Sequence, residues 1–147
     1  PPPYPAIAQY MTWKIIDKKW QKYPLDLWPL ALGHDHMIDR FLVRRLNDRP
    51  DDIELAALAQ WQASDQPFHI IRRDLYEGIP IGANNWGGTA AALPDILNVL
   101  DAHYEELAPY KDLTHILWPI IKNHTMIHDQ HYTLHNARPL PEKMDGA

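Results

Sequence analysis

Nine histidines occur in this chain of 147 residues, and they lie inside apolar segments rather than in a terminal tract. Neutral imidazole is a common ligand of transition metals, often together with carboxylates. Cysteine is absent, which excludes thiolate ligands, disulfides and cysteine nucleophiles. The composition therefore raises the question of a metal site built from imidazole and carboxylate alone. The nine are His34, His36, His69, His103, His115, His124, His128, His131 and His135.

Acidic residues follow several histidines at fixed spacings. An aspartate lies five residues after His34, His69 and His124. On an α-helix this offset turns about 140°, so the two groups flank a point instead of stacking on one face. Glu106 lies three residues after His103, a spacing that does share a face. Each carboxylate is thus a candidate ligand, a hydrogen-bond partner of the imidazole, or neither.

The last histidine-rich segment carries the densest pattern. His124, His128, His131 and His135 are separated by four, three and four residues, which is one stripe of a helix. Four imidazoles on a buried face are costly unless they are hydrogen-bonded, ligated or hydrated. A solvated face or a pH-sensitive contact is the alternative to ligation.

The elements that would position these residues read as helices. Helical periodicity is widespread, and the alternation expected of half-buried strands is weak. A segment rich in glycine and asparagine, 79–89, is the one clear loop. We expect an N-terminal helix over 5–22 and four longer helices over 27–47, 51–77, 90–108 and 112–136.

These helices predict an all-α fold, an up-down four-helix bundle with an additional N-terminal helix. The chain length fits a single domain. We divide it into an N-terminal arm at 1–23, the bundle at 24–137 and a tail at 138–147, which we expect to be extended or disordered.

A similar phrase opens the first and last bundle helices. Leu-Trp-Pro-aliphatic, then a histidine and an aspartate, occurs from Leu27 and again from Leu117. Proline is common in the first helical turn, so each copy predicts a helix start. In an up-down bundle these two helices are neighbours, and His34 and His124 would then turn toward the same interior point.

Each of the four predicted bundle helices carries a histidine, namely His34, His69, His103 and His124. Facing helices of a bundle are close enough for such side chains to share one ion. We therefore predict an iron site, with manganese and zinc as alternatives, because imidazole and carboxylate suit all three. The candidate metal ligands are His34, His36, His69, Asp74, His103, His124, His128 and Asp129.

This arrangement resembles the hemerythrin or HHE cation-binding family over roughly 27–129. The resemblance implies a non-haem di-iron centre between histidines and carboxylates, and a role in dioxygen binding, sensing or redox chemistry. It departs from the family pattern at Arg73, which stands where a carboxylate is usual, and at Leu107; a mononuclear site is the alternative. The positions that carry the resemblance are His34 or His36, His69, His103, Asn123-His124 and Asp129.

A second resemblance is to the DinB-like bundles. It rests on His124-x3-His128-x2-His131-Tyr132 and on Phe68-His69 with Asp74. It implies one divalent metal held by three histidines, and a transferase or hydrolase activity on that metal.

The remaining interpretation is a non-catalytic helical subunit of a larger assembly. Six tryptophans and seven tyrosines are a heavy aromatic load, and aromatic side chains anchor interfaces, so a protein partner on an aromatic-rich surface is the expectation here. The paired arginines at 44–45 and 72–73 are expected to form a solvated, ion-paired face.

Charge and hydropathy exclude other classes of protein. The formal net charge is −5 and no basic cluster is dense, which argues against nucleic-acid binding. No apolar run approaches 18 residues, so we expect no membrane span. The absence of cysteine fits a cytoplasmic location, and the first residues lack the layout of a signal peptide, although a targeting segment that was already cleaved would leave no trace.

Overall fold

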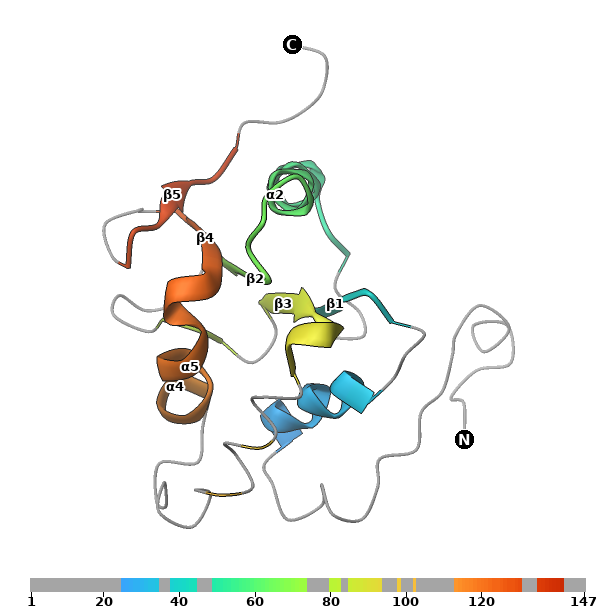
Figure 1. Cartoon of the computed structure of the whole chain (residues 1–147). Helices are drawn as coiled ribbons and strands as arrows, with labels where there is room; N and C mark the ends of the chain where they lie inside the picture. Colours follow the sequence, from blue (N-terminus) through green and yellow to red (C-terminus); the bar gives the residue numbers. More distant parts are fainter. Residues whose placement is uncertain are drawn as a thin grey trace.

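A mixed five-stranded sheet forms the centre of the molecule, with strand order β1-β3-β2-β4-β5 (Figure 1). The strands are β1 (Arg40–Val43), β2 (Phe68–Arg72), β3 (Trp86–Thr89), β4 (Thr125–Asp129) and β5 (Arg138–Pro139). The computed structural model describes residues 25–34, 38–44, 49–73, 80–82, 85–93, 98, 102, 113–130 and 135–141.

Four of the five strands run in the same direction. β3 is antiparallel to both of its neighbours, β1 and β2, so β1 and β2 point the same way. β4 is parallel to β2, and β5 is parallel to β4. The carboxyl ends of β1, β2, β4 and β5 therefore meet at one edge of the sheet, which we call the carboxyl edge.

Helix α2 (Asp52–Gln62) covers one face of the sheet and begins near the carboxyl edge (Figure 1). The Asp51 side chain caps it by accepting a hydrogen bond from the Glu54 backbone N–H, 2.9 Å away. Leu58 and Trp61 form a small buried cluster with Met126 of β4. Helix α2 is thereby fixed to the centre of the sheet.

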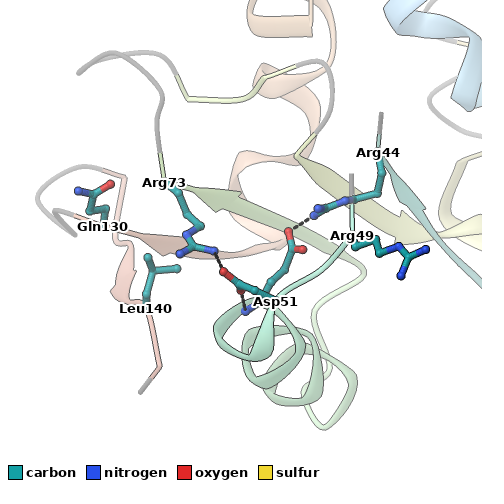
Figure 2. A pocket seen from close by; sticks show the side chains of 7 residues that line it. Arg44, Arg49, Asp51, Arg73, Gln130 and Leu140 are labelled. Carbon is teal, nitrogen blue, oxygen red and sulfur yellow. Dashed lines mark hydrogen bonds and ion pairs between the residues drawn. The ribbon is translucent and has the colours of Figure 1, made fainter. Parts of the chain in front are cut away.

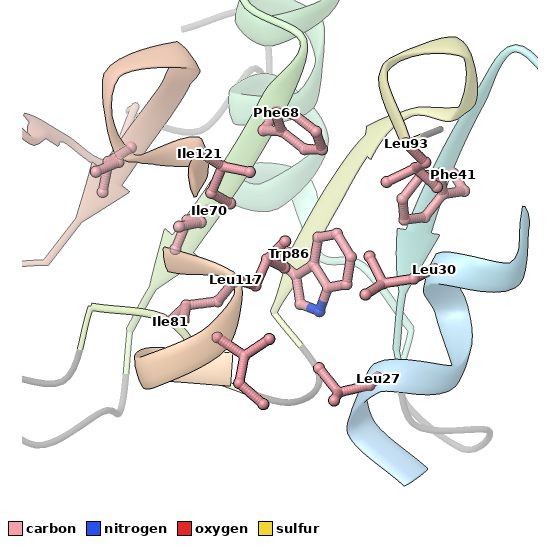
Figure 3. Close-up of a cluster of buried hydrophobic side chains, with 12 residues drawn as sticks. Leu27, Leu30, Phe41, Phe68, Ile70, Ile81, Trp86, Leu93, Leu117 and Ile121 are labelled. Atoms are coloured by element: carbon pink, nitrogen blue, oxygen red, sulfur yellow. The ribbon is translucent and has the colours of Figure 1, made fainter. Parts of the chain in front are cut away.

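The larger core lies on the opposite face, beneath the helical segments η2 (Leu25–His34), η3 (Ala90–Ala92), α4 (Leu113–Ile116) and α5 (Trp118–Ile121). Trp86 lies at the centre of this cluster, between side chains of η2 and α5 (Figure 3). Its ring packs edge-on against Phe41, with the ring centroids 5.3 Å apart. A short segment η5 (Lys122–His124) then leads from α5 into β4.

Two glycines let β3 fit between β1 and β2. A Cβ on Gly87 would lie 2.5 Å from the Phe41 carbonyl oxygen, and one on Gly88 would lie 2.7 Å from the Phe68 ring. The backbone of Phe41 and the buried Phe68 ring cannot easily move away from an added Cβ. A larger residue at either glycine would therefore displace β3. The pair Gly87-Gly88 therefore serves close packing.

The predicted all-α fold is wrong. The segments predicted as helices 27–47, 51–77 and 112–136 contain β1, β2 and β4, and the predicted loop contains β3. Of the five residues of β2, all are buried. A strand that is covered on both faces shows no polar alternation, so its apolar run was taken for part of a helix.

Other parts of the prediction fare differently. The helix start near 51 is confirmed by α2, and Pro119 lies in the first turn of α5, as the Trp-Pro pattern predicted. The other copy of the pattern does not start a helix, because Pro29 lies inside η2, which begins at Leu25. Part of the predicted tail forms β5. The predicted N-terminal helix at 5–22 and most of that at 90–108 lie outside the described residues. No described helix is long and apolar enough to cross a membrane.

Candidate functional site

Two of the predicted metal ligands, His69 and His128, lie together beneath α2. They occupy the neighbouring parallel strands β2 and β4, where His69 is paired with Met126. Residues two positions apart along a strand share a face, so His128 lies on the same face as Met126 and His69. His69 Nε2 and His128 Nδ1 are 2.8 Å apart, and His128 Nε2 is 2.8 Å from Gln60 Oε1 of α2. The His69 ring is stacked on Trp61, at 5.4 Å between centroids and 14° between planes.

The hydrogen bonds determine which nitrogen of each neutral ring carries the proton. The side-chain amide oxygen of Gln60 accepts, so His128 Nε2 carries a proton and donates it. His128 Nδ1 is then the acceptor for the proton on His69 Nε2. Burial, reinforced by His128 and Arg138, lowers the pKa of His69 to about 3. Burial and Arg138 lower the pKa of His128 to about 4, so both rings are neutral near pH 7.

The histidine pair is closed off from ligands. His69 is 1% exposed and His128 is 0% exposed. The cavity that His69 lines has a volume of about 10 Å³, which is at the lower limit for a single water molecule. The pair therefore joins β2, β4 and α2 as part of the packed interior.

The other predicted ligands do not join this pair where they are described. His124 is exposed at the end of η5. Asp129 alternates onto the opposite face of the sheet and pairs with Arg72, at 2.7 Å between Oδ2 and Nε. His34 ends η2, but its side chain lies outside the described part of the chain, as do all of His36, Asp74 and His103.

The hemerythrin-like and DinB-like four-helix bundles are therefore not the architecture of this protein. The metal centres that these resemblances imply lie between the helices of a bundle, whereas His69 and His128 come from adjacent strands. Among the described residues, no group of three or more histidine, aspartate or glutamate side chains is placed to hold a metal ion. Iron, manganese or zinc binding stays a prediction, because the side chains of four proposed ligands lie outside the described part of the chain.

A different site opens at the carboxyl edge. A pocket of about 510 Å³ lies between the ends of the strands and the start of α2 (Figure 2). Four of the lining residues directly follow the last residue of a strand: Arg44 follows β1, Arg73 follows β2, Gln130 follows β4 and Leu140 follows β5. The remaining lining residues, from the entry to α2 and its first turn, are Arg49, Asp51 and Glu54.

Two ion pairs hold arginines in place around this pocket. Arg44 pairs with Glu54, whose side chain is 7% exposed, and Arg73 pairs with Asp51 (Figure 2). Asp51 thus bonds to the start of α2 with one carboxylate oxygen and to Arg73 with the other. Each guanidinium has five N–H donors, so these pairs leave further donors for a ligand.

Arg49 differs from the other two arginines. It is exposed, and it forms no hydrogen bond or ion pair with another residue that the structure describes. With three arginines and two carboxylates, the lining residues that the structure describes carry a net charge of +1 on a chain whose formal net charge is −5. This described part of the lining is therefore positive on an acidic protein.

A buried ion pair supports the same edge from the other face. Arg72, which is 3% exposed, pairs with Asp129 and also contacts His135 Nδ1 through Nη1 at 2.7 Å. Because arginine only donates, His135 Nδ1 accepts. Burial and the Arg72 charge lower the pKa of His135. The Gln130 N–H also donates to the Arg72 carbonyl at 2.9 Å, so β2 and β4 stay paired up to the pocket.

This pocket was not predicted from the sequence. Arg44 and Arg73 were expected on a solvated, ion-paired face; the ion pairs are present, but the side chains line one pocket. The available signal was a short apolar run followed by polar residues, as in the stretches that end at Arg73 and Gln130. That signal has meaning only once the runs are read as parallel strands.

Comparisons with known proteins do not identify a family. No protein-family model, no curated protein and no solved structure shows a significant match to this chain. The function therefore has to be argued from the geometry of the carboxyl edge.

Proposed function

We propose that this protein binds a small polar anion, a phosphate ester or a carboxylate, in the pocket at the carboxyl edge. The observation that carries the proposal is the convergence of residues from the ends of β1, β2, β4 and β5, together with three arginines, on one pocket. In open α/β sheets, ligands bind in the crevice outside the carboxyl ends of the strands.

The size and lining of the pocket favour a small hydrophilic ligand. Ligand pockets commonly measure roughly 300–1,000 Å³, and about 510 Å³ lies within that range. Of the lining residues that the structure describes, Leu140 is the one apolar residue. An apolar ligand would gain little from such a surface, whereas a metabolite with charged and hydroxyl groups would find a partner for each.

The electrostatics favour an anion. Arginine binds phosphate and carboxylate oxygens through paired N–H groups, and its charge persists at all physiological pH values. Asp51 and Glu54 hold Arg73 and Arg44 in position before a ligand arrives. Among the lining residues that the structure describes, Arg49 is the cation that shares its charge with no carboxylate, so we expect it to contribute most to the attraction.

Isothermal titration calorimetry with glycerol 3-phosphate tests the proposal. We expect saturable binding that weakens with added salt, because exposed charges are screened. Arg49→Ala should weaken binding about tenfold, the usual loss for one charge-assisted hydrogen-bonding partner. Arg49→Lys should give an intermediate affinity, since lysine keeps the charge and loses the paired N–H groups.

Lys122→Ala is the matched control. Lys122 is exposed in η5, before β4 begins and thus at the opposite edge of the sheet, and its removal changes the net charge by the same amount. Its affinity should stay at the wild-type value. If Lys122→Ala and Arg49→Ala weaken binding equally, the attraction is a property of the net charge, and the pocket is not the site.

The remaining sequence-based predictions stay predictions. They are a non-haem metal that handles dioxygen, a single-metal transferase or hydrolase activity, a non-catalytic role in a larger assembly, and a cytoplasmic location. The anion proposal assigns a binding site and no reaction.

A further inference from the structure

Resting on the proposed function, we infer that the natural ligand of the carboxyl-edge pocket carries two separate anionic groups, one for each side of the pocket. Figure 2 shows the cations on two sides of an acidic floor: Arg73 on one side and Arg44 with Arg49 on the other, with Asp51 between them. Glu54 adds a second carboxylate to that floor.

The strand order separates the backbones that carry the two arginines. Arg44 follows β1 and Arg73 follows β2, and β3 lies between these strands, so the two backbones are roughly 10 Å apart. The guanidinium groups are bound to different carboxylates, Arg44 to Glu54 and Arg73 to Asp51. Each side of the pocket therefore offers its own cation to an anionic group.

The acidic floor argues against one large, continuous anion. A ligand with charge along its whole length would place negative groups over Asp51 and Glu54, where like charges repel. A ligand with anionic ends and a hydroxylated or otherwise neutral middle would place each end at an arginine and offer hydrogen-bond donors to the carboxylates. The chemical class is therefore a polar chain with a phosphate or carboxylate group at each end.

A series of linear α,ω-diol bisphosphates with increasing spacer length tests this inference in calorimetry. Each is compared with the monophosphate of the same diol, which has a hydroxyl group at the far end. We expect the best bisphosphate to bind at least about tenfold more tightly than its monophosphate, since a second charge-assisted contact forms. The gain should rise to an optimum spacer and then fall. A gain that is the same for every spacer would reflect charge alone and would overturn the inference.

Variants on the two sides sharpen the test. In Arg73→Gln and in Arg49→Gln, one anionic end loses its partner, so the ratio of bisphosphate to monophosphate affinity should fall toward one in both. Lys122→Gln should keep the wild-type ratio. The ratio is insensitive to a general loss of attraction, because both ligands would weaken together.

The outcomes separate this inference from the proposed function. If monophosphates bind the wild-type protein, depend on Arg49 and match the bisphosphates in affinity, the pocket takes one anion and the two-ended ligand is wrong. If neither class binds, the anion-binding function itself is wrong. If linear dicarboxylates show the same spacer optimum as the bisphosphates, the inference of two anionic ends holds. The anionic group at each end can then be a carboxylate or a phosphate.

Discussion

The two ends of helix α2 lie over polar clusters of opposite character. Under its last turns, Gln60 contacts the pair of His69 and His128, which is buried, neutral and enclosed. At its first turn, Asp51 and Glu54 meet arginines around an open pocket. The comparison teaches that reactive residue types do not by themselves mark a ligand site; access and position at the strand ends do.

If the histidine pair is structural, acid should destabilise the protein strongly. In the unfolded chain both rings titrate near 6.5, whereas the folded values are about 3 for His69 and about 4 for His128. Above pH 6.5 neither state takes up protons at these sites. As the pH falls below 6.5, the unfolded chain binds protons first, so stability is lost progressively toward pH 4.

At pH 5 this linkage amounts to about 2 kcal/mol for each histidine, or about 4 kcal/mol for the pair. Urea denaturation at pH 7 and pH 5 measures it. In His69→Gln the difference between the two pH values should shrink by about half, whereas His124→Gln, which alters an exposed ring, should leave it unchanged. A wild-type stability that is equal at both pH values would contradict the account of this pair.

Removal of one ring should separate stability from binding. His128→Ala leaves a cavity and leaves the proton donor of His69 without its acceptor, so we expect a loss of about 3 kcal/mol in the free energy of unfolding. The affinity for glycerol 3-phosphate should change by less than about twofold, because the ring does not line the pocket. Urea denaturation and calorimetry on the same protein check both expectations. A tenfold loss of affinity in a folded His128→Ala protein would contradict this account, because it would show that the histidine pair takes part in ligand binding.

The N-cap residue offers the smallest and most selective test. Asp51→Ala should cost about 1 kcal/mol of stability through the lost cap. It should also strengthen anion binding by roughly two- to fivefold, because Arg73 no longer shares its charge with Asp51. Asp51→Ser keeps a capping oxygen, so it should recover most of the stability and retain the gain in affinity. A weaker affinity in both variants would mean that the positioning of Arg73 by Asp51, or a hydrogen bond from the ligand to Asp51, outweighs the charge that Asp51 neutralises.

The sequence predicted what depends on neighbours along the chain. The start of α2 at Asp51 and the first turn of α5 at Pro119 follow from capping and proline geometry, which act within one turn.

The sheet and the pocket could not be predicted in this way. β2 and β4 are adjacent in space, yet Phe68 and Thr125 are far apart in the chain, and a pairing of that kind leaves no local pattern. The spacing of His124 and His128 fits one helical face, but Thr125 begins a strand and the two rings end in different environments. Without the strands, Arg44 and Arg73 carried no sign that they share a pocket.

The central claim is that a small anion binds at the carboxyl edge, and a ¹⁵N–¹H correlation spectrum titrated with glycerol 3-phosphate tests it most directly. The account predicts saturable shifts in the backbone amides of Arg44, Glu54, Arg73 and Gln130, with little change at His69 and His128. Saturable shifts that centre on the histidine pair or on η5, or a spectrum unchanged at millimolar ligand, would contradict it.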